Sequence, residues 1–421
     1  MSLIKKISAY EIVDSHGTPT IEAKIFLDNG LMTRTSVPAG GTSRFEVSEL
    51  RDKDSKRFAG LGVLQAVGYI NDLIGPKLVG ISPLKQQEID NWLIKADGTK
   101  NKSRLGGNTI SVISQLIAKA GALESRMPLF LYLNKLYANL NNEELKIVKI
   151  PTPIFIMING GNHASDELEF QEFQVIPSSS YSFSQAFQLS IEIFNELKKT
   201  LQYRNTGVSV GEEGGLTPKV TSNLDALELL NETIRRKDLR SGLDVFFGLD
   251  VAANFFYKSD RYILKEKPHP LNQKEFIDYL VSLIKIYPVL FLEDPLYEDD
   301  FDGWKKLLEI LPNSIYLVAD DLVASNKNRL VHALKSHSCS AVVIKPNQIG
   351  TITETFELVS LAKKNKLSYI VSGRAGETND DFIADFAVAM QSEFIKFGSP
   401  IRGERVAKYN RLLEIEREEL K

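Results

Sequence analysis

VFFGLD, residues 245–250, is an unbroken apolar run that ends in an acid. Three later stretches have the same design: VLFLE ends at Glu293, YLVAD at Asp320 and AVVIK at Lys345. Short runs of Val, Ile, Leu and Phe with little alternation are typical of strands buried on both faces. The intervening stretches are long enough for a helix and a return, so the repeated strand–helix units predict a parallel β/α barrel.

The last residues of these strands, Asp250, Glu293, Asp320 and Lys345, are candidates for one active site. In barrels of this kind the active site lies at the C-terminal ends of the strands. Three carboxylates there form an oxygen-only set that suits Mg²⁺. A lysine beside a divalent cation has a reason to lose its proton and act as a base. Each acid taken alone is equally well explained as a helix cap or turn former, but capping gives no role to the lysine.

The composition excludes several function classes. The 421 residues suffice for two domains with a large core, and a formal net charge of −3 provides no basic footprint for nucleic acid. Cys339 is the single cysteine, which rules out an internal disulfide, and we expect an inert core thiol. The first residues lack the apolar core of a signal peptide, and no run is long enough to span a membrane. We therefore expect a cytoplasmic protein.

The sequence pattern changes between the first and second parts of the chain. Before about residue 60, the alternation in TIEAKIFLD and the turn signal DNG predict a strand and a hairpin. Helical patterning follows in residues 62–74 and 108–126, and the polar stretch 139–149 is typical of a linker. We predict an N-terminal α+β capping domain over residues 1–138 and a β/α barrel over residues 139–421.

Three loop-like segments combine glycines with polar residues. Residues 157–173 (MINGGNHASDELEFQEF) and 209–218 (SVGEEGGLTP) carry adjacent glycines and several acids. Glycine pairs let a backbone turn tightly or approach a ligand closely, although either segment is also explained as an ordinary turn. Residues 37–46 (VPAGGTSRFE) fit a flexible lid over the site as well as they fit a surface loop.

Ordered motifs run along almost the whole chain: DSHGTPTIEA, ELRDKDSKRFAGLGV, DGTKNKSRLGGNT, INGGNHA, FQEF, VGEEGG, FLED, VADDL, IKPNQIGTITET, SGRAGET and RVAKYNRLLEIE. Together they resemble the enolase family of glycolytic phosphopyruvate hydratases. The resemblance implies an N-terminal α+β domain on a barrel whose first units are irregular. It also implies a homodimer or larger homo-oligomer, two Mg²⁺ ions per active site, and a small phosphorylated hydroxy acid as substrate.

Carried over residue by residue, the resemblance implies the catalytic roles. The ligands of the tighter Mg²⁺ would be Asp250, Glu293 and Asp320. Lys345 would remove the proton next to the substrate carboxylate, and Glu213, supported by Glu172, would help hydroxide leave. The proton is very weakly acidic, so two divalent cations and a lysine are needed to stabilise the charge that its removal creates.

The resemblance also implies the residues that bind the substrate. Gln171 and His163 would line the pocket. Arg374 would hold the phosphate and Lys396 the carboxylate. Thr42 stands where the family has a lid serine that meets the second Mg²⁺.

The sequence departs from the family's pattern at several of these motifs. Gly373 and Ala375 flank Arg374 where the family has a histidine and a serine, so an imidazole and a hydroxyl are missing from the phosphate segment. Arg44 replaces a glycine of the lid, and His16 replaces an arginine. The remaining departures are Glu212 for Asp and Asn254–Phe255 for a Ser–Glu pair.

Three functions remain open at this point. The first is a Mg²⁺-dependent hydro-lyase that interconverts 2-phosphoglycerate and phosphoenolpyruvate. The second keeps the proton abstraction but uses a related phosphonate or carboxylate, as in an enzyme resembling carboxyphosphonoenolpyruvate synthase. The third is a non-catalytic binding protein, such as a surface or RNA-associated scaffold. The complete catalytic set argues against the third, and Gly373 and Ala375 divide the first from the second.

Overall fold

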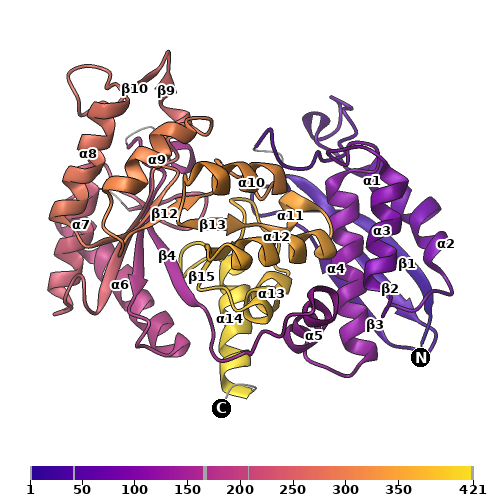
Figure 1. The fold of residues 1–421 in the computed structure, drawn as a ribbon. Helices are drawn as coiled ribbons and strands as arrows, with labels where there is room; N and C mark the ends of the chain where they lie inside the picture. The colour runs from indigo at the N-terminus through magenta and orange to yellow at the C-terminus, as the bar shows by residue number, and fades with distance from the viewer. Residues whose placement is uncertain (1, 41–42, 165–167, 207, 419–421) are drawn as a thin grey trace.

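The structure is a computed structural model that describes residues 2–40, 43–164, 168–206 and 208–418. Its N-terminal part lies beside a barrel formed by the rest of the chain (Figure 1). The N-terminal part contains an antiparallel sheet in the order β1–β2–β3, made of β1 (Ile4–Val13), β2 (Pro19–Leu27) and β3 (Met32–Ser36). The predicted hairpin is present, because Gly30 turns the chain between β2 and β3 with φ +88°.

Helices complete the N-terminal part, and the last of them packs mainly against the barrel rather than against this sheet. They are α1 (Leu64–Gly68), α2 (Gly75–Leu78), α3 (Gln86–Asp97), α4 (Gly107–Glu124) and α5 (Leu129–Asn141), with a π-helical turn at Tyr69–Ile74. The two regions predicted to be helical therefore are helical. Ile21 and Ile25 of the sheet share one buried core with Ile113 and Leu116 of α4.

Eight strands of the described chain close into the barrel. They are β4 (Thr152–Asn159), β5 (Glu172–Pro177), β8 (Val245–Asp250), β11 (Val289–Glu293), β12 (Tyr316–Ala319), β13 (Ala341–Ile344), β14 (Ser368–Ser372) and β15 (Phe394–Lys396). The β15–β4 pairing completes the ring. Side chains such as Phe291, Val343 and Phe394 fill its interior.

The first barrel unit is irregular, because β5 runs antiparallel to both of its neighbours, β4 and β8. The first residue of β5, Glu172, therefore lies opposite Asp250, the last residue of β8. The other neighbouring pairs in the ring are parallel, as the apolar runs predicted. Because β5 is antiparallel, its first residue, Glu172, lies at the rim where the other strands end.

Helices surround the barrel (Figure 1). They are α6 (Phe183–Tyr203), α7 (Asn223–Arg236), α8 (Gln273–Ile286), α9 (Phe301–Ile310), α10 (Lys327–Ser336), α11 (Pro346–Ile349), α12 (Ile352–Lys364), α13 (Phe382–Met390) and α14 (Gly403–Glu418). Two short hairpins decorate the loops, β6 (Ser209–Val210) with β7 (Leu216–Thr217) and β9 (Tyr257–Lys258) with β10 (Arg261–Tyr262).

Two sequence expectations can be compared with this architecture. The predicted linker, residues 139–149, was wrong at its start, because α5 continues to Asn141, where Asn142 ends it in the left-handed conformation. The helix extends because apolar residues such as Leu133 and Tyr137 are buried in the barrel core.

Burial raises the pKa of the Cys339 thiol to about 12, which agrees with an inert core residue.

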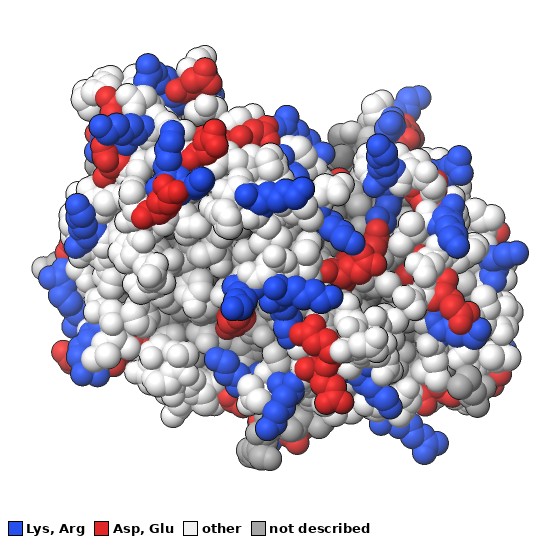
Figure 2. Space-filling model, viewed as in Figure 1, with Lys and Arg blue, Asp and Glu red and all other residues white. Residues whose placement is uncertain are grey.

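Among the described residues, no helix is long and apolar enough to cross a membrane. On the face drawn in Figure 2, lysines and arginines are interspersed with acids.

A largely buried ion pair joins the two parts of the molecule. Asp380, which follows β14, accepts hydrogen bonds from Lys119 of α4 at 2.8 and 3.0 Å, and from Thr35 and Ser36 of β3. Burial raises the pKa of Asp380, but the charge and hydrogen bonds of Lys119 outweigh it and leave that pKa below its ordinary value. The ionised aspartate therefore stabilises the fold above an unfolded-state pKa of about 3.9, and this contribution is lost as pH falls through the folded-state pKa.

Asp380→Asn is expected to lower the free energy of unfolding by about 3 kcal/mol, because Lys119 loses its nearest counter-charge in a largely buried site. This loss is at the low end of the range for broken buried ion pairs, because Asp381 Oδ1 still lies 3.8 Å from Lys119 Nζ. Urea unfolding at neutral pH measures it. Glu357→Gln, which breaks the exposed pair with Lys327, is the control and should cost less than about 1 kcal/mol. Equal losses in the two variants would contradict the assignment.

Candidate active site

The four predicted strand-end residues meet at one rim of the barrel. Asp250 and Glu293 are the last residues of β8 and β11. Asp320 and Lys345 directly follow β12 and β13. Lys396 ends β15 and joins them. Each strand is apolar and buried up to its end, so its last side chain is the first that reaches the open rim.

Lys396 lies at the centre of this rim. Its Nζ contacts Glu172 Oε2 at 2.9 Å, Asp250 Oδ2 at 3.1 Å and both carboxylate oxygens of Glu293 at 2.9 Å. Burial lowers the pKa of Lys396, but these carboxylates outweigh it and raise the pKa well above its ordinary value. Burial and the charge of Asp250 raise the pKa of Glu293 well above its ordinary value, although Lys396 opposes them. The cluster has more negative charge than one lysine neutralises.

Lys345 and Asp320 form a second, largely buried pair, with Nζ of the lysine bonded to Oδ2 of the aspartate. Burial raises the pKa of Asp320, but Lys345 and Lys396 outweigh it, and that pKa lies below its ordinary value. Burial lowers the pKa of Lys345, but the Asp320 carboxylate outweighs it and raises that pKa. In the protein without metal, Lys345 is therefore protonated at neutral pH.

The carboxylates of this rim fit a divalent cation. Asp250 Oδ1 and Asp320 Oδ1 are buried and have no hydrogen-bond partner in the described part of the chain. A buried carboxylate oxygen without a partner is costly unless something else neutralises it. Together with Glu293 these residues offer oxygen atoms alone, which is the ligand type that Mg²⁺ prefers.

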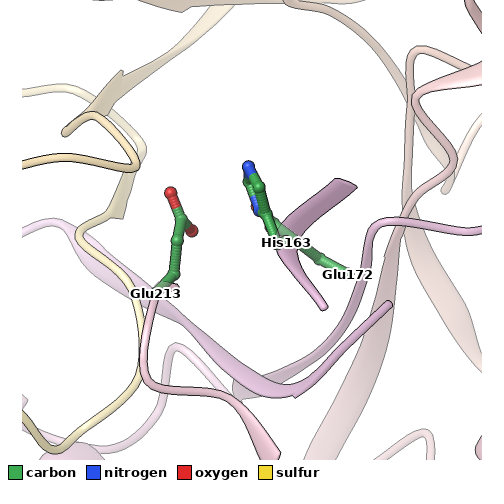
Figure 3. A group of neighbouring side chains, drawn as sticks. All are labelled: His163, Glu172 and Glu213. Atoms are coloured by element: carbon green, nitrogen blue, oxygen red, sulfur yellow. The ribbon is translucent and has the colours of Figure 1, made fainter. Parts of the chain in front are cut away.

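A second group faces this rim from two loops and β5. Ligand atoms of His163, Glu172 and Glu213 lie within 4.8 Å of one another. Figure 3 shows Glu213 and His163 approaching each other from different segments, with Glu172 beside His163. Burial lowers the pKa of His163 despite the Glu172 carboxylate, 3.7 Å from its Nδ1. An imidazole suits transition metals better than Mg²⁺, so the oxygen-only set at Asp250 remains the better magnesium candidate.

The glycine-rich loop 209–218 places Glu213. Gly211 donates to the carbonyl of Gly215 at 2.8 Å, and Gly214 has φ +90°, a conformation that side chains disfavour. The carbonyl of Glu213 accepts from Ser399 N at 3.0 Å, which fixes the loop against the chain that follows β15. The predicted role of these glycines, a tight turn at the site, agrees with this geometry.

Arg374 pairs with a residue that sequence reasoning missed. Its guanidinium donates to both oxygens of Glu46, at 2.8 and 3.2 Å, across the boundary between the two parts of the molecule. Burial raises the pKa of Glu46, but Arg374 outweighs it and the pKa lies below its ordinary value. Glu46 stands inside the quoted VPAGGTSRFE segment, yet nothing in a linear sequence pairs it with a residue 328 positions away.

Two further acids support the metal candidate and were also missed. Asp294 accepts hydrogen bonds from the backbone N–H of Asp320 at 3.1 Å and of Asp321 at 2.7 Å, so it positions the turn that carries Asp320. Burial and the charge of Asp320 raise the pKa of Asp321 to about 7. The doubled acids in FLED and VADDL were the available signal.

The predicted lid is described only in part. Thr42 lies outside the described residues, so its predicted contact with a second Mg²⁺ stays a prediction. Arg44, the departure from the family's glycine, contacts Glu298 Oε1 at 3.0 Å and Asp299 in the loop after β11. Gly40 N donates to Glu49 Oε1 at 2.7 Å.

Most of the predicted site residues border one cavity of about 400 Å³. Of the predicted site residues, the cavity is lined by His163, Gln171, Glu172, Glu213, Asp250, Asp320, Lys345, Arg374 and Lys396. Gln171 lies with Nε2 3.4 Å from Asp250 Oδ2. Glu293 is covered by Lys396. The departures His16, Glu212, Phe255, Gly373 and Ala375 also line it. The cavity therefore joins the metal candidate to the altered anion segment.

The fold and this site define a β/α-barrel enzyme with carboxylates and lysines at the strand ends. Models of the enolase C-terminal TIM barrel domain and the enolase N-terminal domain match residues 147–421 and 4–133. Enolase from Ehrlichia canis (strain Jake) is 42% identical over 416 residues, covering 99% of this chain and 96% of that protein. Enolases from Ehrlichia chaffeensis (strain Arkansas) and Ehrlichia ruminantium (strain Welgevonden) are 41% and 42% identical over 415 residues, each covering 98% of this chain and 96% of the relative. The chain belongs to the enolase family and is a lyase of the phosphopyruvate hydratase type.

Proposed function

We propose that this enzyme interconverts 2-phosphoglycerate and phosphoenolpyruvate in a Mg²⁺-dependent step of glycolysis. The observation that carries the proposal is the meeting of three carboxylates with Lys345 and Lys396 at one barrel rim. Abstraction of a proton beside a carboxylate needs a base and fixed positive charge in one place; Lys345 would be the base once it has lost its own proton, and Lys396 would contribute positive charge.

Two Mg²⁺ ions per site are part of the proposal. Asp250, Glu293 and Asp320 would hold one of them, and the partnerless oxygens of the two aspartates support this assignment. When bound, the ions would supply positive charge that stabilises the charge developing on the substrate carboxylate and favours neutral Lys345. Thr42 is proposed for the second ion.

Lys345 would take the proton from the carbon next to the substrate carboxylate, so that this C–H bond breaks and its electron pair moves toward the carboxylate. Return of that pair forms the carbon–carbon double bond and expels the hydroxyl group, which takes a proton from Glu213 and leaves as water. Burial raises the pKa of Glu172, Lys396 opposes this, and the charge of Glu213 adds to it. Two close carboxyls in such a site can keep one proton between them.

The remaining residues would bind and orient the substrate. Arg374 would hold the phosphate and Lys396 the carboxylate, with Gln171 and His163 at the walls of the cavity. Arg374 and Lys396 are both buried and held by carboxylates, which fixes their positions before a ligand arrives. Fixed donors lose less entropy on binding than mobile ones.

An absorbance assay for phosphoenolpyruvate tests the proposal. With 2-phosphoglycerate and Mg²⁺ the absorbance should rise, and a chelator should stop it. Manganese run in parallel gives the metal preference. No phosphoenolpyruvate at saturating substrate and metal would contradict the proposed reaction.

One observation favours the second candidate, a related phosphonate or carboxylate substrate. Gly373 and Ala375 leave the segment around Arg374 without the imidazole and hydroxyl of the family pattern. If 2-phosphoglycerate is the substrate, Ala375→Ser should lower its KM roughly 10- to 100-fold by adding a hydrogen bond to a charged acceptor. Steady-state kinetics of the wild type and the variant decide this. An unchanged KM would favour the alternative substrate, or show that position 375 does not meet the phosphate.

Gly373→His is the companion variant. An added Cβ would stand 3.1 Å from Glu377 Oε1, so the flexible carboxylate must shift slightly to admit it.

We propose further that the enzyme is a cytoplasmic homodimer or larger homo-oligomer, with domains over residues 1–138 and 139–421. Sedimentation and limited proteolysis test the assembly and the boundary.

A further inference from the structure

His16 lines the active-site cavity from the N-terminal part of the chain. It is one of two histidines there, the other being His163. The proposed mechanism gives it no role. Its side chain is 28% exposed and the residue as a whole is exposed, so the imidazole is open to solvent as well as to the cavity.

A rigid turn holds His16 against the altered anion segment. Asp14 Oδ1 accepts from the backbone N–H of His16 and of Thr18, both at 2.9 Å. Ser15 N donates to the carbonyl of Glu377 at 2.8 Å, and Glu377 N donates to Ser15 Oγ at 3.0 Å. These bonds tie the turn to the stretch that contains Gly373 and Ala375.

Gly376 allows this close approach. A Cβ at position 376 would lie 2.5 Å from Asp14 Oδ2 and 3.3 Å from His16 Nδ1. The first distance is shorter than real contacts allow, so a larger residue would displace at least the Asp14 carboxylate that holds the turn. The imidazole therefore lies beside the segment that lacks its own imidazole and hydroxyl.

The ring nitrogens of His16 differ from the lysines and the arginine of the cavity, which are all held by carboxylates, whereas Nδ1 of His163 also has no hydrogen-bond partner among the described residues. Lys345 is bonded to Asp320, Lys396 to three carboxylates and Arg374 to Glu46. The nearest carboxylate to His16 is Glu212, whose Oε2 lies 3.9 Å from Nε2, beyond hydrogen-bond distance. Within the described residues, no hydrogen bond reaches either ring nitrogen of His16.

We propose that His16 is a substrate-binding residue that donates a hydrogen bond to the anionic group of the substrate beside Arg374. Through it, the N-terminal part would supply a donor where Gly373 and Ala375 offer no polar side chain. The inference rests on the proposed function for the identity of the ligand. A phosphorylated hydroxy acid bound by Arg374 and His16 together would be held from both parts of the molecule.

The test compares His16→Ala, His16→Gln and the control His269→Ala in the full-length, Mg²⁺-loaded protein. His269 is exposed and lies outside the cavity, so its variant should match the wild type. Calorimetry with 2-phosphoglycerate measures Kd without needing turnover. His16→Ala should raise Kd roughly 10- to 100-fold, the size expected for losing a hydrogen bond to a charged acceptor. His16→Gln, which keeps a donor, should lose less.

An unchanged Kd in His16→Ala would overturn the inference. So would a fall in kcat at unchanged Kd, because His16 would then act through Glu212 on the loop of Glu213. Failure of the proposed function gives a different result, since the wild type would bind 2-phosphoglycerate without forming phosphoenolpyruvate, and Kd would still report on His16. If His16→Ala does not fold, as judged by its melting temperature, the Kd of His16→Gln decides, and a value equal to that of His269→Ala overturns the inference.

Discussion

Lys345→Ala is expected to lower the rate of exchange of the proton next to the substrate carboxylate by roughly 10²- to 10⁴-fold, the usual contribution of a positioned base. Removal of the amine deletes the group that takes the proton. Metal affinity should change little, because Asp250, Glu293 and Asp320 are all retained. Exchange of the substrate proton with deuterium, followed by NMR, measures the effect.

Glu213→Gln is the matched comparison for this experiment. It should slow formation of phosphoenolpyruvate more than it slows proton exchange, because Glu213 acts on the leaving hydroxyl. The fold should persist, since the loop around Glu213 is held by backbone hydrogen bonds of Gly211, Gly214 and Ser399. Equal loss of exchange in the two variants would show that the division between base and acid is wrong.

Glu293→Gln is expected to remove most of the stabilisation that Mg²⁺ gives the protein. With free Mg²⁺ at about 100 times its Kd, the wild type should gain about 2.7 kcal/mol in free energy of unfolding. The variant loses one carboxylate ligand and should gain far less at the same concentration. Turnover of Glu293→Gln should fall by more than roughly 10- to 100-fold. That smaller loss is typical when a residue that only hydrogen-bonds to a metal ligand is removed.

Thermal unfolding with and without Mg²⁺ gives this stabilisation independently of activity. Lys396 retains Glu172 and Asp250 in the variant, so the fold without metal should survive. Glu309→Gln, an exposed change of the same charge on α9, is the control and should respond to Mg²⁺ as the wild type does. If Glu293→Gln gains as much as the wild type, Glu293 is not a ligand of the stabilising ion.

Much of the candidate site could be predicted from local pattern. An apolar run of four to six residues gives a buried strand, and the residue at its end reaches the rim whichever strand it belongs to. For this reason Asp250, Glu293, Asp320 and Lys345 could be placed together before any contact was known. Their convergence needs only parallel strands that start and end at the same levels.

The partners of these residues could not be predicted in the same way. Glu172 stands at the start of a strand, and it reaches the rim because β5 runs antiparallel to β8. Lys396 lies among the carboxylates because β15 closes the ring against β4. Neither the direction of β5 nor the closure of the ring is written in the spacing of apolar residues.

The sequence by itself therefore determined the strands, the two-part organisation and the chemical types at the strand ends, because burial of apolar runs is a local property of the chain. Only the tertiary structure decided which charges neutralise one another. Glu46 meets Arg374 across 328 residues, and His16 reaches the anion segment through the turn at Asp14. Such pairings depend on how the two parts of the molecule pack, and charged groups interact through space over a few ångströms regardless of their distance along the chain.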